Sequence, residues 1–258
     1  MKITVAICTW NRAPVLRRVL ESISNASPPR QSAWEILIIN NNCTDATDDV
    51  AGEFRVRLPI FLHHEKNPGL SNARNKAIEV SSGDYIVWID DDVTVRRDWI
   101  AEFERAFLQW REVSVFGGSI FPALEGDPPL WLRSLRWFFP SSFVIYGKRN
   151  FPEGPIDLAS GKLPFGGNFA VRAEEQRKFR YDRSLGRRPG TLLFAYEETD
   201  VIRAILTTGG KGRWVPAAAV DHWIPRSRQT LSYLRIFYLG LWWTGFKSAL
   251  IARRRIKI

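Results

Sequence analysis

Apolar runs alternate with amphipathic stretches along the first half of the chain. The stretches between the runs carry apolar residues at helical spacing, and most of the runs end in polar residues. Short apolar runs rich in Ile, Val and Leu are typical of buried strands, and they occupy residues 3–8, 35–39, 60–63, 85–89 and 113–120. This alternation of strand and helix predicts an α/β fold with a mainly parallel, doubly wound central sheet flanked by helices.

The rhythm changes after residue 120. Residues 122–165 are rich in Pro, Gly and aromatic residues, and only Leu130–Phe138 has a helical pattern. A long segment with so little regular structure is commonly functional, so we expect a lobe or lid over a binding site. A helix from Glu197 to Leu206 and a last strand, Trp214–Val220, then follow.

Three consecutive carboxylates, Asp90, Asp91 and Asp92, directly follow the apolar run 85–89. Like charges at the end of a buried strand repel one another and lose solvation, so they need a cation or hydrogen-bond donors nearby. In open α/β sheets ligands bind outside the carboxyl ends of strands, where this cluster should lie. Hard oxygen ligands suit Mg²⁺ or Mn²⁺. The alternative is a solvated acidic loop without a ligand.

The chain is strongly basic, with a formal net charge of +10 and a pI of about 9.9. Nucleic acid and an anionic membrane surface are the two partners that such a charge suggests. The cations gather near the C-terminus among Trp, Phe and Tyr, so we expect the membrane and no nucleic acid. Cys8 and Cys43 form no disulfide framework, and residues 1–5 lead into a strand rather than a signal peptide. We therefore expect a cytoplasmic protein.

A basic amphipathic helix is expected over residues 230–258, after one domain that spans 1–229 in two halves, 1–120 and 121–229. Between Arg235 and Lys247 the apolar stretch is about half of the ~20 residues that a membrane-spanning helix needs. Trp and Leu beside Lys and Arg are typical of a helix that lies at a membrane interface. A core helix packed on the domain is the open alternative. Four aromatic residues of the middle segment could face the same surface: Trp131, Trp137, Phe138 and Phe139.

Several short motifs stand in a fixed order along residues 1–225. They are Thr9-Trp10-Asn11-Arg12, Asn40 to Asp45, Asn67 to Asn75, Asp90-Asp91-Asp92, Gly166-Gly167-Asn168, Glu197 to Asp200, and His222. Each is weak alone, but in this order the chain resembles the family 2 glycosyltransferases. The resemblance implies a GT-A fold, an inverting hexosyltransferase-type enzyme, and a donor sugar linked to UDP, GDP or dTDP. It also implies a Mg²⁺ or Mn²⁺ ion and a sugar or lipid-linked acceptor, in bacterial cell-surface polysaccharide or glycolipid biosynthesis at the inner face of the cytoplasmic membrane.

The same resemblance implies a role for each motif. Thr9, Asn11 and Arg12 would line the nucleotide pocket, and Asn40 and Asn41 would contact the base. Asn72, Arg74 and Asn75 would face the donor, and Asp90 or Asp91 would bind the ribose. Asp92 is the expected metal ligand, with His222 on the metal or the diphosphate. Glu198, beside Glu197, is the expected general base. The loop Gly166, Gly167 and Asn168 would approach the donor or acceptor sugar, since glycine permits close contact.

Two positions depart from the family pattern. Asn40 and Asn41 stand where members commonly carry Asp, and an amide donates as well as accepts, so the identity of the base stays open. Glu197-Glu198 replaces the usual Glu-Asp pair, which makes the base one methylene longer.

Each candidate also has a structural alternative. Arg74 could be a solvated helix residue, His222 a packed histidine, and Glu197-Glu198 an acidic first helical turn. For the whole chain the alternatives are a metal-dependent nucleotidyltransferase and a non-enzymatic protein that binds membrane surfaces. No Gly-x-x-x-x-Gly-Lys-Ser/Thr, Gly-x-Gly-x-x-Gly or Gly-x-Ser-x-Gly motif occurs, which disfavours kinases, dinucleotide enzymes and α/β hydrolases.

Overall fold

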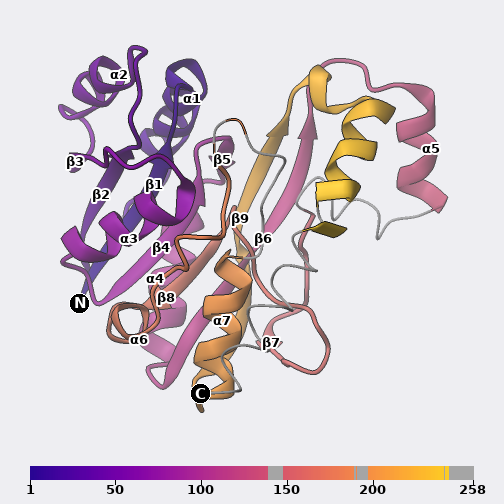
Figure 1. Ribbon diagram of the computed structural model, residues 1–258. Helices are drawn as coiled ribbons and strands as arrows, with labels where there is room; N and C mark the ends of the chain where they lie inside the picture. Colours follow the sequence, from indigo (N-terminus) through magenta and orange to yellow (C-terminus); the bar gives the residue numbers. More distant parts are fainter. Residues whose placement is uncertain (139–147, 189, 191–196, 241, 244–258) are drawn as a thin grey trace.

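A computed structural model of the chain describes residues 1–138, 148–188, 190, 197–240 and 242–243, without the side chains of residues 135–138 (Figure 1). The strands are β1 (Lys2–Thr9), β2 (Ala33–Asn40), β3 (Ile60–His64), β4 (Tyr85–Asp90), β5 (Val93–Val95), β6 (Val113–Leu124), β7 (Gly154–Pro155), β8 (Phe169–Arg172) and β9 (Lys211–Ile224). The helices are α1 (Ala13–Ser24), α2 (Thr47–Phe54), α3 (Leu70–Val80), α4 (Trp99–Gln109), α5 (Leu130–Phe138), α6 (Ala173–Lys178) and α7 (Glu197–Thr207), with a 3-10 helix at Arg226–Arg228. Residues 231–240 and 242–243 are also helical, and we call them the C-terminal helix.

The described strands form one sheet in the order β3-β2-β1-β4-β8-β6-β9-β5, with β7 beside β9. The prediction of an α/β fold with a central sheet is confirmed. Strands β1 to β4 are parallel, and so are β6 and β9, but β8 runs antiparallel to both β4 and β6. Strand β8 follows Gly166-Gly167-Asn168 and pairs Phe169 with Trp88, so it starts where β4 ends. The return of the chain through residues 148–168 therefore brings the Gly166 loop to the aspartate turn.

Side chains of the central strands alternate between two buried layers. Ile3, Val5 and Ile7 of β1 pack with residues of α1, α2 and α4, whereas Ala6 packs with residues of α3 and α7. The same alternation holds along β2 and β4, where apolar residues occupy consecutive positions because both faces are covered. The result is a three-layer arrangement in which the carboxyl ends of β1, β2 and β4 meet at one edge (Figure 1).

Strands β6 and β9 continue past the sheet and carry α5 and the C-terminal helix at their far end (Figure 1). Leu132 of α5 and Ile224 of β9 form a small apolar cluster there, and Leu234 of the C-terminal helix packs against it. The helix predicted over Leu130–Phe138 has those bounds in the structure. The last strand is longer than predicted, because it continues to Ile224 instead of ending at Val220. Within the described residues, every helix is too short or too polar to cross a bilayer.

A bulge interrupts the pairing of β6 with β9. Gly118 pairs with Val215, but the next residue, Ser119, pairs with Ala219, so residues 216–218 of β9 have no partner in the ladder. Asn168 fills the gap: its Nδ2 donates to the carbonyls of Ser119 and Ala218 at 2.9 and 2.7 Å. A Cβ at Gly118 would lie 2.1 Å from that Nδ2, so glycine is required there.

Asn168 is 1% exposed, and its Oδ1 accepts a hydrogen bond from Trp99 Nε1 at 2.9 Å. We expect Asn168→Ala to lower the free energy of unfolding by roughly 3 kcal/mol, because it leaves buried donors and acceptors without partners. Asn168→Asp keeps the shape but sets a carboxylate against two carbonyls, and it should cost at least as much. Urea unfolding at pH 7 measures both changes.

Asn67→Ala is the control, because the Asn67 side chain bonds Glu65 at an exposed position. It should change stability by no more than about 0.5 kcal/mol. Wild-type stability in Asn168→Asp would contradict the role of Asn168 at the bulge.

Candidate functional site

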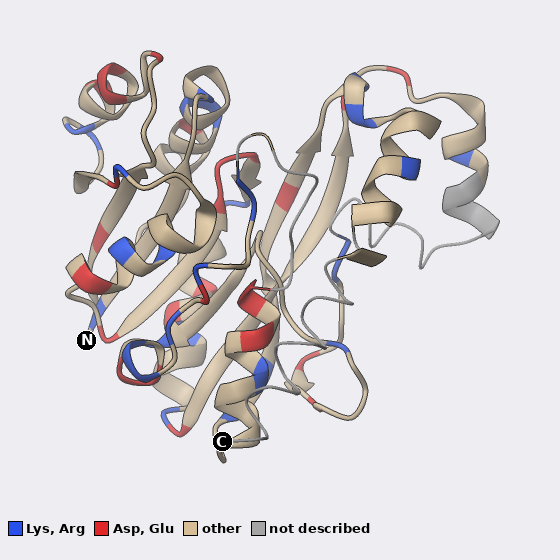
Figure 2. Ribbon diagram, in the orientation of Figure 1, with Lys and Arg blue, Asp and Glu red and all other residues tan. Residues whose placement is uncertain are grey.

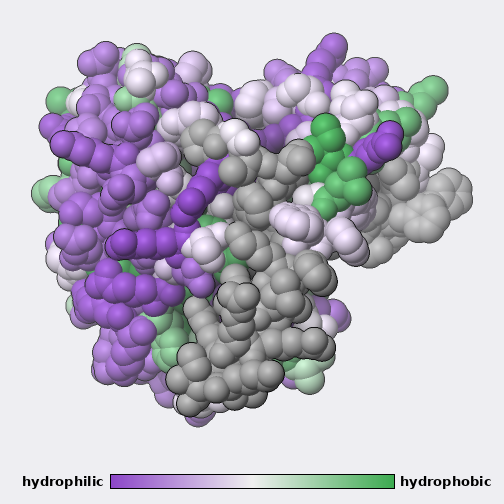
Figure 3. All heavy atoms as spheres, in the orientation of Figure 1, coloured by the Kyte–Doolittle hydropathy of each residue, from purple (hydrophilic) through white to green (hydrophobic). Residues whose placement is uncertain are grey.

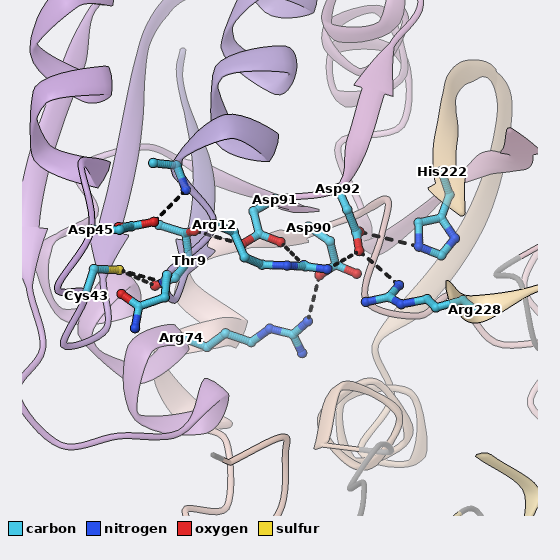
Figure 4. Close-up of polar contacts among 12 residues, drawn as sticks. Thr9, Arg12, Cys43, Asp45, Arg74, Asp90, Asp91, Asp92, His222 and Arg228 are labelled. Atoms are coloured by element: carbon cyan, nitrogen blue, oxygen red, sulfur yellow. Dashed lines mark hydrogen bonds and ion pairs between the residues drawn. The ribbon is translucent and has the colours of Figure 1, made fainter. Parts of the chain in front are cut away.

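The polar ends of three neighbouring strands meet at the carboxyl edge of the sheet. Thr9 of β1 pairs with Asn40 of β2, and Cys8 pairs with Asp90 of β4, so the ends of these strands lie side by side. The sequence placed its candidate residues after these same strands, and parallel pairing is what gathers them at one edge. Figure 4 shows the aspartates and their partners there.

Asp91 and Asp92 are buried and neutralised by guanidinium groups. Arg12 Nη1 lies 2.5 Å from Asp91 Oδ1, and Arg12 Nη2 lies 3.2 Å from Asp92 Oδ2. Thr9 Oγ1 donates to the other Asp91 oxygen at 2.7 Å. Burial raises the pKa of Asp91 to about 6, although the charge of Arg12 opposes that rise. Thr9 and Arg12, which were predicted to line the nucleotide pocket, bond the aspartates of the turn in this structure.

His222 reaches the same turn through strand pairing. Strand β5 follows Asp92 and runs antiparallel to β9, so Val93 pairs with His222 and Trp223 N donates to Asp92 O at 2.8 Å. His222 Nε2 lies 3.4 Å from Asp92 Oδ1. The histidine therefore lies inside β9 and not after the strand, which corrects the predicted strand end.

Arg228 completes the surroundings of Asp92. It lies on the 3-10 helix after β9, and its Nη1 bonds Asp92 Oδ2 at 3.2 Å (Figure 4). Burial opposes ionisation of Asp92, but His222, Arg12 and Arg228 outweigh it and hold the pKa of this carboxyl well below its usual range. Sequence reasoning missed Arg228, because an arginine in a basic segment carries no motif of its own.

The residues at Asp92 fit a divalent cation. Asp92 Oδ1 and His222 Nε2 face each other at a distance suited to two ligands of one ion, while both arginines bond the other oxygen. Among the described residues no group of three or more His, Cys, Asp or Glu could hold a metal. Mg²⁺ is commonly held by one or two protein carboxylates, with phosphates and water in its other positions, and Asp92 is the carboxylate available here.

Glu197 and Glu198 open α7 and meet a buried arginine. Arg74 of α3 is 3% exposed, and its Nη1 lies 2.9 Å from Glu197 Oε1 and 3.4 Å from Glu198 Oε2. Its Nη2 lies 3.7 Å from Asp90 Oδ1. The guanidinium therefore joins the carboxylates of α7 to the aspartate turn, although Arg74 stands more than a hundred positions before them.

Gly166 occupies the space between the two carboxylate groups. Its N–H donates to Glu198 Oε1 at 3.1 Å, and a Cβ at this position would lie 3.2 Å from Asp90 Oδ2. A larger residue would crowd Asp90, so glycine lets the loop approach both acids closely. Gly167 is buried beside Ile120, and Asn168 fills the bulge described above. The predicted loop thus reaches the site through Gly166.

The two glutamates have different charge environments. Burial raises the pKa of Glu197 to about 8, and the neighbouring charge of Glu198 adds to the rise. Burial also opposes ionisation of Glu198, but Arg74 and the N–H groups of Glu198 and Gly166 outweigh it, so the pKa of Glu198 is lowered. Glu197 Oε2 is buried without a hydrogen-bond partner, which suits a protonated acid. The pair therefore places one ionised carboxylate, Glu198, at the site.

The predicted base-binding turn is held by its own amides. Asn41 Nδ2 donates to the carbonyls of Glu65 and Asn67, and its Oδ1 accepts from Gly69 N. Asn40 bonds Asp48 and the N–H of Cys43. Asn11 has φ of 51°, a left-handed conformation that asparagine tolerates, and its Oδ1 accepts from Thr44 N. These asparagines shape the turn in this structure.

Two more predicted donor residues lie on α3. Asn75 exchanges two hydrogen bonds with the backbone of Tyr181, at 2.9 and 3.0 Å, and it is buried. Asn72 is half-exposed and donates to Pro68 O. Tyr181, held by Asn75, lies against the Arg74 guanidinium with its ring 5.2 Å away. No local pattern of residues marks Tyr181, since its role depends on long-range packing. Residues 191–196, which precede α7, lie outside the described part of the chain.

Comparison with known proteins adds a family and a fold. Residues 4–163 match the family described as Glycosyl transferase family 2. The chain is similar to a glucosyl-dolichyl phosphate glucuronosyltransferase of Haloferax volcanii, with 25% identity over 93% of this chain and 75% of the relative. It is also similar to the succinoglycan biosynthesis protein ExoM of Rhizobium meliloti, with 24% identity over 91% of this chain and 71% of the relative.

Two solved structures share the fold. The structure of S. aureus TarS 1-349 in complex with UDP-GlcNAc matches with a TM-score of 0.61 and 14% identity. The mannosyltransferase PcManGT from Pyrobaculum calidifontis, in complex with GDP-Man and Mn²⁺, matches with a TM-score of 0.57 and 18% identity. The matches cover 87% and 85% of this chain, and 58% and 56% of those longer chains.

Replacement of Arg74 tests the buried charge cluster. Arg74→Met leaves three acidic side chains, two of them ionised, without their shared cation, so we expect a loss of about 3 to 5 kcal/mol of unfolding free energy at pH 7. Without the cation the folded-state pKa of Glu198 rises, so the variant should lose further stability relative to wild type as pH increases from 5.5 to 8. Urea unfolding across this pH range measures the difference in unfolding free energy between the variant and wild type.

A second variant tests the cause. Adding Glu198→Gln to Arg74→Met removes the ionised acid of the pair and should recover part of the loss. Two results would contradict the explanation by buried charge. One is a stability difference between Arg74→Met and wild type that stays constant with pH, and the other is a double variant no more stable than Arg74→Met.

Proposed function

Because the chain belongs to glycosyl transferase family 2 and is a glycosyltransferase with the GT-A fold, we propose that it transfers a sugar, with inversion, from a nucleotide-diphosphate donor to an acceptor hydroxyl. One observation carries this proposal. Arg74 and Gly166 join Asp90 to Glu198, so an acidic turn suited to a cation and an ionised carboxylate suited to a base belong to one site.

The aspartate side of this site would receive the donor. Arg12, Arg228 and His222 surround Asp92, and a diphosphate held there would meet guanidinium groups that match its geometry. TarS in complex with UDP-GlcNAc and PcManGT in complex with GDP-Man support a nucleotide-sugar donor. The turn of Asn40 and Asn41, with Thr9 and Asn11, would line the base, which could be uracil, guanine or thymine.

Asp92 and His222 would hold the divalent cation, Mg²⁺ or Mn²⁺. When bound, the cation would neutralise the charge that develops on the departing diphosphate. PcManGT, which was solved with Mn²⁺, supports this cofactor. Asp90 is the most exposed of the three aspartates, with 37% of its side chain exposed, and it would be free to meet the donor ribose.

Glu198 would be the general base. Its ionised carboxylate takes the proton of the acceptor hydroxyl while that oxygen attacks the anomeric carbon from the side opposite the diphosphate. The new C–O bond forms as the bond to the diphosphate oxygen breaks, so the nucleoside diphosphate leaves and the configuration inverts. Gly166 N–H and Arg74 fix the orientation of Glu198, and Glu197 stays protonated beside it.

The acceptor would be a sugar or a lipid-linked sugar of a cell-surface polysaccharide or glycolipid, handled at the inner face of the cytoplasmic membrane. The two relatives support this class, because one is named for a glucosyl-dolichyl phosphate and the other for succinoglycan biosynthesis. Residues 121–229 would bind it, since α7 and the Gly166 loop face the donor side from there. A nucleotidyltransferase would release pyrophosphate, whereas the proposed reaction releases a nucleoside diphosphate.

Glu198→Gln tests the base. The amide keeps the size of the side chain but cannot take the proton, so we expect kcat for transfer to fall by at least about 100-fold while donor affinity changes little. Release of UDP, GDP or dTDP from a panel of nucleotide sugars with Mn²⁺ measures turnover, and calorimetry measures donor binding. Because Glu198 must be ionised, wild-type kcat/KM should fall as pH decreases through its pKa. Wild-type turnover in Glu198→Gln would overturn this assignment.

Asp92→Asn tests the cation site independently of turnover. The variant should bind Mn²⁺ in the presence of the nucleoside diphosphate at least about tenfold more weakly, because an amide oxygen carries no charge for the ion. Titration followed by the electron paramagnetic resonance of free Mn²⁺ gives the affinity. Asp221→Asn is the matched control, since Asp221 lies next to His222 but pairs with Arg96 at 2.9 Å. Equal affinities in the two variants would contradict the assignment of Asp92.

A further inference from the structure

Arg149 is a half-buried cation that forms no ion pair with any described residue. Its Nε and Nη1 donate to the carbonyls of Leu163 and Lys148 at 3.4 and 3.2 Å, and its Cζ lies 4.0 Å from the centre of the Phe165 ring. Burial lowers the pKa of Arg149 to about 10, although the charge of Glu198 opposes that fall. The arginines of the site described above differ, because each of them pairs with at least one carboxylate: Arg12, Arg74 and Arg228.

The acids closest to Arg149 in the chain are engaged elsewhere. Residues 148–165 contain two of them, Glu153 and Asp157. Glu153 lies 3.4 Å from Arg213, and Asp157 Oδ1 accepts a hydrogen bond from Ala159 N at 2.9 Å. A guanidinium that is taken out of water without a counter-ion is destabilising for the fold. The charge of Arg149 is therefore left for an anion that the segment itself does not supply.

The guanidinium of Arg149 lies beside the loop that holds Glu198. Phe165, on which it stacks, precedes Gly166, and Gly166 N–H donates to Glu198 Oε1 at 3.1 Å. A β-bridge with Ile120, with hydrogen bonds of 2.6 and 2.9 Å, fixes the backbone of Arg149 at this place. Figure 2 shows basic positions on the chain that leads from α5 to β7 and acidic positions at the start of α7. The structure thus sets a cation near the expected base without pairing the two.

We propose that Arg149 binds an anionic group of the acceptor, a phosphate or a carboxylate, while Glu198 takes the proton of an acceptor hydroxyl. This inference rests on the proposed function, because it names the class of acceptor that the same site would take. A guanidinium has five N–H donors in a planar fork that matches both anions, and among the described residues Arg149 uses only Nε and Nη1. The anion and the reacting hydroxyl would be attached to different carbons of the acceptor. The cation is therefore expected beside the base and not in contact with it, which is how Arg149 and Glu198 lie.

The donor diphosphate is the less favoured partner of Arg149. The arginines that bond Asp92 are Arg12 and Arg228, and the cation and the diphosphate are proposed to lie there. Strand β2, which ends in the nucleotide turn, is separated by β1, β4 and β8 from β6, to which Arg149 is bridged. Figure 3 shows a mainly hydrophilic surface over α2 and α3, on the nucleotide side. An anion at Arg149 would thus approach Glu198 from the acceptor half of the chain.

Two kinds of acceptor would supply such an anion. A lipid-linked sugar carries it as a phosphate, whereas a uronic acid carries it as a carboxylate. An anionic membrane, the partner expected for the basic C-terminal segment, would bring the first kind to the site. That partner stays a prediction, because the side chains of Trp137 and Phe138, Phe139, and the tail beyond residue 243 lie outside the described part of the chain.

Acceptor kinetics with the full chain test the proposal. Each sugar of a panel is offered with the same phenyl group in three forms: the neutral phenyl glycoside, the phenyl uronide and the sugar 1-(phenyl phosphate). Release of the nucleoside diphosphate with Mn²⁺ measures transfer. We expect wild-type kcat/KM to be at least about tenfold higher for one anionic form than for the neutral form, as for a hydrogen bond between charged groups. Arg149→Gln should bring this ratio to about one, through a higher KM for the anionic form.

Arg213→Gln is the matched control. Arg213 also stacks on an aromatic ring, with its Cζ 3.7 Å from the centre of the Trp110 ring, but its partner is Glu153. The control should keep the wild-type ratio. Three results would overturn the proposal: equal kcat/KM of wild type for all three forms, a preference that Arg149→Gln retains, and an Arg149→Gln variant that lowers kcat/KM for all three forms by one factor, which indicates a structural role.

A binding measurement separates this inference from the proposed function. Calorimetry with the same uronides and phenyl phosphates gives the affinity of wild type and of Arg149→Gln without any turnover. Hydrolysis or transfer by wild type, with no preference for either anionic form in kinetics or calorimetry, would refute the role of Arg149 alone. Binding of an anionic form that depends on Arg149, in a protein that neither hydrolyses nor transfers from any nucleotide sugar, would refute the proposed function alone.

Discussion

The buried guanidinium of Arg74 is the interaction on which the site depends. A buried cation with 3% exposure needs charged and polar partners, and here Glu198 and Asp90 supply negative charge while Glu197 Oε1 accepts a hydrogen bond. These carboxylates are in turn stable there only because of the cation. Since the partners come from α3, the end of β4 and the start of α7, one charge cluster fixes where the second half of the chain lies on the first. Tyr181 covers the guanidinium and excludes water from it.

A second charge cluster lies at the other end of the aspartate turn. Arg12 and Arg228 neutralise Asp92, and Thr9 and Arg12 hold Asp91, so the two later aspartates are buried and fixed. Asp90 lies between the clusters and keeps part of its side chain exposed. The turn therefore holds two of its acids in place with guanidinium groups and leaves Asp90 partly exposed. A strand that ends in three identical residues thus provides three different environments.

The residue pattern was sufficient to predict six of the strands, β1 to β4, β6 and β9, together with the acidic turn and a helix that begins at Glu197, because each depends on a local signal. It could not predict which residues pair across the chain. Arg74 had been assigned to the donor, yet its partners stand more than a hundred positions away and no periodicity links them. Strand β8 joins the sheet in the antiparallel direction after the chain has passed through residues 148–168, and that segment has no regular sequence pattern from which this direction could be predicted. Asn168 carried a motif suggestive of ligand binding, but its amide serves a bulge that appears only once β6 and β9 are paired.

That bulge also determines which face of the sheet the later side chains of β9 occupy. Val215 and Ala219 are four positions apart and would share a face in an uninterrupted strand, yet they pair with adjacent residues, Gly118 and Ser119, and so lie on opposite faces. Every side chain beyond residue 218 is inverted by this irregularity, including His222. The three unpaired residues thus act as a spacer that sets which side of the sheet the imidazole occupies. A change of one residue in the length of this remote spacer would turn the histidine away from the aspartates without altering any residue that touches them.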